Sequence, residues 1–141
     1  ALWDNIDVID SIASDHAPHT KEEKDTLKPP PFGVPGLETT LSLLVNAYHQ
    51  GKLTLERIQE LTHDTPKRLF NVPTQEDTYV EVDLDQPFTI HNSQIVSKCG
   101  WTPFDGMTVK GKIIKVVLRG QEVYDGSSVK IVNAGQVLYP H

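Results

Sequence analysis

The chain has 141 residues, 38% of them hydrophobic, which is enough for one compact core or for a part of a larger one. Its formal net charge is -6, and its 13 lysines and arginines are scattered, which argues against a nucleic-acid surface. A single cysteine excludes an internal disulfide and favours a reducing, cytoplasmic setting, and no apolar run is long enough to suggest a membrane span.

The first predicted element is a buried strand over residues 6–13. Apolar residues dominate this segment, which ends at the polar stretch "SDHAPHT" of residues 14–20. A carboxylate at the end of a parallel strand is well placed to contact a metal or to move a proton, so Asp15 is a candidate functional residue. The spacing alone leaves an alternative open, in which Asp15 caps an ordinary surface turn and the neighbouring histidines are solvated.

The next predicted elements are a loop and three helices. The charged, proline-rich residues 20–35 predict a loop that is long for a simple connector and therefore invites a functional role. A helix is expected after it, because Leu37, Leu41, Leu44, Val45 and Tyr48 form an apolar stripe that Gly51 closes. Thr54 is expected to cap a second helix, and Thr65 a short third one with Pro66 at its first position.

Beyond Val72 the apolar residues alternate with polar ones, which predicts strands. A turn at Arg119-Gly120 is expected to lead from one strand into its partner. We expect the alternating apolar faces to pack against the helical half of the chain. These faces are formed by Val80, Val82 and Leu84 in one strand and by Ile114, Val116 and Leu118 in another.

Four segments together resemble a known family. They are "SDHAPHT" (14–20), "KPPPFGVPGLET" (28–39), "EDTYVEVDL" (76–84) and "SKCGWTPFDGMTVKGKIIKVVLRGQEVYDG" (97–126). In this order they resemble the C-terminal third of a dihydroorotase of the amidohydrolase superfamily. The resemblance is strongest to the dihydroorotase domain of animal-type multifunctional pyrimidine proteins, and it covers about residues 1 to 130.

The resemblance implies an α/β fold. It would be the C-terminal part of a metal-dependent (β/α)8 barrel, with the last strand and the following helices in residues 1–72, plus a small β-rich domain in residues 73–126. Residues 127–141 would be a C-terminal tail or the start of an interdomain linker. Because a barrel of this type needs about 250 residues, we expect the chain to be a fragment.

The resemblance also implies roles for four residues. Asp15 matches the aspartate that contacts a binuclear zinc centre and moves the catalytic proton. His19 matches the histidine that holds a substrate carboxylate, Ala17 offers a backbone contact, and Pro31 belongs to a loop that closes one side of the substrate pocket. The family's other zinc ligands have no counterpart in the chain, so most ligands are expected to lie outside it.

The implied activity is the reversible cyclisation of N-carbamoyl-L-aspartate to L-dihydroorotate in de novo UMP synthesis. The same polypeptide would carry carbamoyl-phosphate synthetase and aspartate transcarbamoylase domains and form a cytoplasmic homo-oligomer, with neither nucleic acid nor a membrane as partner. The isolated fragment is expected to be inactive. Two alternatives stay open: a catalytically silent dihydroorotase-like scaffold, and a cyclic amidohydrolase of the hydantoinase or allantoinase type.

Overall fold

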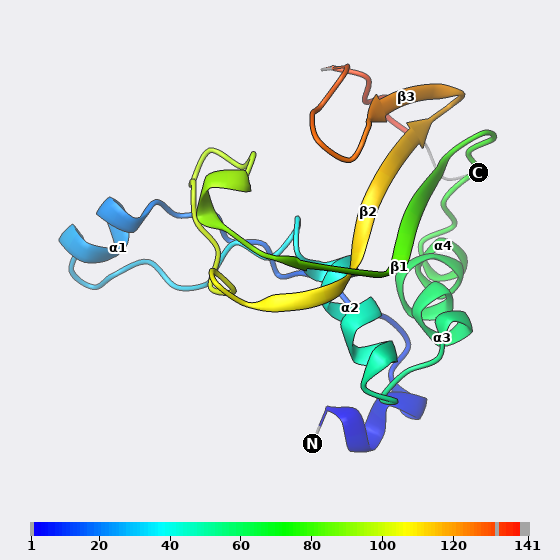
Figure 1. Cartoon of the computed structure of the whole chain (residues 1–141), viewed down its shortest axis with the longest axis horizontal. Helices are drawn as coiled ribbons and strands as arrows, with labels where there is room; N and C mark the ends of the chain where they lie inside the picture. Colours follow the sequence, from blue (N-terminus) through cyan, green and yellow to red (C-terminus); the bar gives the residue numbers. More distant parts are fainter. Residues whose placement is uncertain (1, 132, 139–141) are drawn as a thin grey trace.

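A computed structural model describes residues 2–131 and 133–138 of the chain. Helical elements dominate the first half of the chain and an antiparallel sheet the second, with one short 3-10 helix between its first two strands (Figure 1). The helical elements are η1 (Trp3–Val8), α1 (Lys21–Thr26), α2 (Thr40–His49), α3 (Leu55–Gln59), η2 (Glu60–Asp64), α4 (Thr65–Leu69) and η3 (Asn92–Gln94). In the described residues the sheet has the order β1 (Tyr79–Thr89), β2 (Thr108–Leu118) and β3 (Gln121–Tyr124).

The predicted strand over residues 6–13 is wrong. Residues Trp3–Val8 form a 3-10 helix, and residues 9–15 belong to neither a helix nor a strand. An extended segment becomes a strand only when another segment bonds along it, and here Ile12 donates its amide to the carbonyl of Leu61 in η2 instead, at 3.1 Å. The apolar side chains are still used, because Ile6 is buried and Ile9 and Ile12 pack against the same core.

That core lies between α2 and α3. Its buried members are Ile6, Leu44, Ala47, Leu53, Ile58 and Leu61. The predicted stripe of α2 is confirmed for Leu44 and Val45, which are buried, and for the half-buried Leu41 and Tyr48. Leu37, however, precedes the helix and is exposed.

Helices α3 and α4 belong to one continuous helical segment. Thr54 caps α3 as predicted, because its hydroxyl accepts the amide hydrogen of Arg57 at 3.1 Å. The predicted cap at Thr65 is wrong, since Thr65 already has helical dihedral angles and the π-helical turn η2 joins α3 to α4. Pro66 lies in the first turn of α4.

Strands β1 and β2 form a long antiparallel hairpin that lies against α2 (Figure 1). The turn at Arg119 and Gly120 leads into β3, as predicted. The contact with α2 is close, because a Cβ on Gly111 would lie 2.4 Å from Cγ1 of Val45. Only glycine leaves room for the helix to approach the strand here.

The prediction of a fully packed strand face is wrong for two residues. Val80 is 45% exposed and Ile114 is 39% exposed, whereas the buried strand residues are Val109 and Val117. The register shows the reason: Glu81 pairs with Lys115 and Val82 with Ile113, so a bulge at Ile114 breaks the alternation on which the prediction relied. Val82, Leu84, Val116 and Leu118 are half-buried.

The boundaries expected at residues 72 and 126 stay predictions. Beyond the second one, Tyr124 forms an isolated bridge with Val129, and Lys130 pairs with Asp125 at 2.6 Å. Positions 132 and 139–141 of the expected tail lie outside the described residues. Within the described ranges, no helix has the length and apolar character needed to cross a bilayer.

Arg57 ties the N-terminal segment to α3. Its guanidinium donates to the carbonyls of Ile6 at 2.9 Å and Ile9 at 2.6 Å, and it pairs with Glu60 at 2.7 Å. Arg57→Met keeps the aliphatic stem but removes the donor to the carbonyl of Ile9 and leaves the carbonyl of Ile6 with only the amide of Ile9, at 3.4 Å. We therefore expect a loss of about 2–3 kcal/mol in the free energy of unfolding.

Urea unfolding followed by tryptophan fluorescence measures this loss. The matched control is Arg68→Met, because Arg68 is an exposed arginine on α4. Equal unfolding free energies for the two variants would contradict the role of Arg57.

Candidate active site

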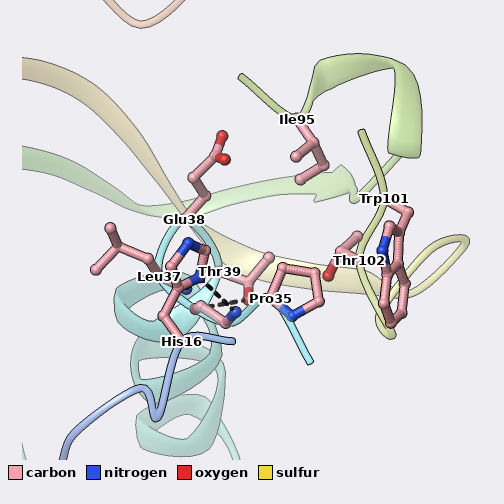
Figure 2. A pocket seen from close by; sticks show the side chains of 9 residues that line it. His16, Pro35, Leu37, Glu38, Thr39, Ile95, Trp101 and Thr102 are labelled. Carbon is pink, nitrogen blue, oxygen red and sulfur yellow. Dashed lines mark hydrogen bonds between the residues drawn. The ribbon is translucent and has the colours of Figure 1, made fainter. Parts of the chain in front are cut away.

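Two segments that are distant in sequence form the candidate site, residues 14–20 and residues 31–37. His16 and Val34 make an isolated parallel bridge, and the amide of Ala17 donates to the carbonyl of Val34 at 3.0 Å. The ring of His16 strengthens this pairing (Figure 2), because its Nδ1 accepts the amide hydrogens of Gly36 at 3.2 Å and Leu37 at 3.3 Å. His16 therefore fixes the start of α2 against the polar turn.

Close packing at Gly33 also holds the two segments together. Gly33 has a φ of +85°, and a Cβ on it would lie 2.4 Å from Cβ of Ala17. A side chain would be strained in this conformation and would separate the segments. The contact places the loop that contains Pro31 directly against the turn that contains Ala17.

Asp15 lies at the exposed tip of the polar turn. Its φ is +45°, a left-handed conformation that aspartate tolerates better than most residues. In the described part of the chain, no hydrogen bond or ion pair is assigned to its carboxylate. The carboxylate therefore has no protein partner among these residues and is available to a metal ion or a proton.

His19 has a half-exposed side chain and a fixed backbone. Its Nδ1 lies 3.7 Å from Oε2 of Glu23, and its carbonyl accepts the indole hydrogen of Trp101 at 2.7 Å. Glu23 also closes a capping box with Thr20 at the start of α1. The amide and hydroxyl of Thr20 hold the pKa of Glu23 below its ordinary value, and the neighbouring His19 acts in the same direction.

Pro31 enters the site through its backbone as well as its ring. Its carbonyl accepts a hydrogen bond from Nζ of Lys24 at 2.8 Å, and Lys24 lies in the last turn of α1. Residues 20–35 are therefore not the plain loop that was predicted, because they include this helix. The spacing of Thr20 and Glu23, three residues apart, was a readable signal for it.

The residues that the structure describes do not form a complete metal centre. No three of their histidine, cysteine, aspartate or glutamate side chains lie close enough together to hold a metal ion. The exposed, unpartnered carboxylate of Asp15 fits the role of one zinc ligand. The further donors of a zinc centre would have to come from elsewhere.

Two hollows lie near the surface, and neither contains Asp15 or His19. The cavity in Figure 2 has about 10 Å³, room for one water molecule, and it lies between His16, Thr39 and Trp101. A second hollow of about 420 Å³ opens beside Arg119.

Comparison with known proteins supplies the family. No protein-family model matches the chain. It is 56% identical over 130 residues to the multifunctional protein pyr1-3 of Dictyostelium discoideum, covering 92% of the chain. It is 48% identical over 140 residues to the multifunctional protein CAD of Squalus acanthias, covering 99% of the chain, and 38% identical over 135 residues to the dihydroorotase of Pyrococcus furiosus, covering 92%.

The chain is homologous to a segment of the dihydroorotases. The resemblance predicted from the four sequence segments is therefore confirmed. The segment is short relative to its relatives, since it spans 6% of each multifunctional protein and 32% of the Pyrococcus dihydroorotase.

Solved structures confirm the predicted fold class. The L-hydantoinase of Arthrobacter aurescens matches the chain with a TM-score of 0.85 and 30% identity, covering 92% of the chain and 32% of the hydantoinase. The inactive dihydroorotase-like domain of a Chaetomium thermophilum CAD-like multifunctional protein matches with a TM-score of 0.74 over 93% of the chain and 37% of that domain. The second match has 24% identity, so it shows a shared fold only.

Proposed function

We propose that the chain is a segment of a dihydroorotase domain and supplies one side of its active site. The observation that carries the proposal is the pairing of residues 14–20 with residues 31–37, which presents Asp15, Ala17, His19 and Pro31 on two adjoining segments. The identity to the Pyrococcus dihydroorotase supports it. We call a polypeptide that includes this chain and has the length of that relative the complete domain.

The proposed reaction joins the ureido nitrogen of N-carbamoyl-L-aspartate to its side-chain carboxyl carbon, with loss of water. In the reverse direction water adds to the ring carbonyl of L-dihydroorotate, and the bond from that carbon to the ring nitrogen breaks. Asp15 takes a proton from the water and delivers it to the leaving nitrogen. In cyclisation the same carboxyl moves the proton the opposite way.

His19 and Ala17 would hold the substrate. A protonated His19 imidazole can donate to the carboxylate that stays outside the ring. The amide of Ala17 is already bonded to Val34, so its contact with the substrate would use its carbonyl, which also accepts the amide hydrogen of His19 at 3.0 Å. A carbonyl has two lone pairs, so it can still accept a ring N–H.

The proposed domain is zinc-dependent. Zinc, when bound, polarises the carbonyl that is attacked. Asp15 would be one ligand, and the remaining ligands would come from parts of the complete domain outside this chain.

The names of the multifunctional relatives support a fused polypeptide. We extend the proposal to carbamoyl-phosphate synthetase and aspartate transcarbamoylase domains on that polypeptide, to a homo-oligomer and to a cytoplasmic location. Such a fusion would place the dihydroorotase step beside the enzyme that makes N-carbamoyl-L-aspartate.

The proton-transfer role of Asp15 is tested by Asp15→Asn in the complete domain. The amide cannot accept the proton, so we expect kcat to fall by about a thousandfold or more while the fold is retained. Steady-state hydrolysis of L-dihydroorotate and circular dichroism measure the two effects. Asp10→Asn is the matched control, because Asp10 is an exposed aspartate in the same segment, and near-normal turnover of Asp15→Asn would reject the role.

A second candidate function is hydantoin hydrolysis, which the likeness to the L-hydantoinase favours. The two functions differ at His19, because an unsubstituted hydantoin ring has no carboxylate for His19 to bind. In the complete domain, His19→Ala should raise the KM for L-dihydroorotate by about tenfold or more and leave any hydantoin hydrolysis unchanged.

Parallel assays of both substrates with the parent domain and the His19→Ala variant decide between the two functions. An equal loss of both activities would contradict the assignment of His19 to the substrate carboxylate. A parent domain that turns over neither substrate would support the remaining alternative, a catalytically silent scaffold.

A further inference from the structure

One side chain links the sheet half of the chain to the candidate active site. Trp101 is 9% exposed, and its Nε1 donates to the carbonyl of His19 at 2.7 Å, across 82 positions of sequence. The bond reaches the backbone of the residue proposed to bind the substrate carboxylate. It therefore restrains the backbone of the turn without using the imidazole of His19.

The loop that carries Trp101 is itself held in place. The amide of the buried Thr102 donates to Oδ1 of Asn92 at 2.8 Å, and the amide of Asn92 donates to Oδ1 of Asp105 at 2.8 Å. The carboxylate of Glu38, just before α2, accepts the amides of two further residues of this loop at 2.8 and 2.9 Å. These hydrogen bonds hold the loop that carries Trp101 in place.

Lys24 connects the indole of Trp101 to Pro31, another candidate for substrate binding. Its Nζ lies 5.9 Å from the centre of the Trp101 ring and donates to the carbonyl of Pro31 at 2.8 Å. Lys21 lies at an equal distance from the indole, 6.0 Å, but among the described residues Lys24 provides the ammonium that bonds to Pro31. The two lysines therefore share the cation–π contact and differ in the hydrogen bond.

We propose that Trp101 and Lys24 are positioning residues for substrate binding, Trp101 acting through His19 and Lys24 acting through Pro31. The inference rests on the proposed function and assigns two residues to its site. Both act on backbone carbonyls, so they set where the binding groups stand without touching the substrate. Interactions of this kind change ground-state binding and the transition state alike, so their loss raises KM and spares kcat.

The test uses Trp101→Phe and Lys24→Met in the complete domain. Phenylalanine keeps a buried aromatic ring but has no N–H, and methionine keeps the stem of lysine but has no ammonium. Loss of one hydrogen bond in each case should raise the KM for L-dihydroorotate by about fivefold, with kcat within about twofold of the parent.

Three control variants separate positioning from general stability. Lys21→Met removes a matched ammonium over the indole without touching Pro31, and Lys24→Arg restores a donor, so both should keep KM within about twofold of the parent. Thr89→Val removes a hydrogen bond between β1 and β2, to Thr108, and should lower the melting temperature without changing KM. Melting temperatures of all variants are measured alongside the kinetics.

Each outcome bears on the inference. A raised KM in Trp101→Phe and Lys24→Met, with normal values in the three controls, supports it. Unchanged KM in both variants of an active domain would overturn the inference alone, and an inactive parent domain would overturn the proposed function and the inference with it. If Trp101→Phe does not fold, the comparison of Lys24→Met with Lys21→Met and Lys24→Arg decides.

Discussion

The pairing of His16 and Ala17 with residues 34–37 is the constraint on which the candidate site depends. One backbone bridge, which includes the bond from the amide of Ala17 to Val34, and an imidazole that accepts two further amides bring together segments about twenty residues apart. Closing a loop of this length has an entropic cost. The close packing of Gly33 on Ala17 and the hydrogen bonds of the helix α1 inside the loop offset part of that cost.

The two halves of the chain meet through polar contacts as well as through packing. Gly111 lets β2 approach Val45 of α2, and the indole of Trp101 reaches the turn that precedes α1. The small sheet is therefore not structurally independent of the helical half of the chain. It packs against the helical layer and carries the side chain that restrains His19.

Much of the local structure could be predicted from the sequence. The cap at Thr54, the turn at Arg119-Gly120 and the apolar stripe of α2 depend on neighbours within a few residues, and the structure confirms them. The helix α1 is equally local, because a capping box joins Thr20 and Glu23, but the prediction of a loop relied on the charge and prolines of residues 20–35 and did not use this signal. The resemblance to dihydroorotases implied a role for each site residue. The spacing alone could not do so, because an Asp with nearby histidines fits an ordinary turn equally well.

What the sequence could not supply were contacts between distant residues. The strand predicted over residues 6–13 needed a bonding partner, and apolar character alone does not provide one. The bulge at Ile114 shifts the face of β2 without any glycine or proline at the bulge itself to announce it. The bonds from Arg57 to Ile6 and from Trp101 to His19 span 51 and 82 positions, so no local pattern predicts them.

The central claim is that this chain holds one side of a dihydroorotase site and needs the rest of the domain to complete it. Elemental analysis for zinc, paired with the rate of N-carbamoyl-L-aspartate cyclisation, tests it directly on the 141-residue chain and on the complete domain. The account predicts stoichiometric zinc and turnover in the complete domain and neither in the chain alone, because Asp15 gains its cation only when the other ligands are present. Tightly bound stoichiometric zinc or turnover in the chain alone would contradict it.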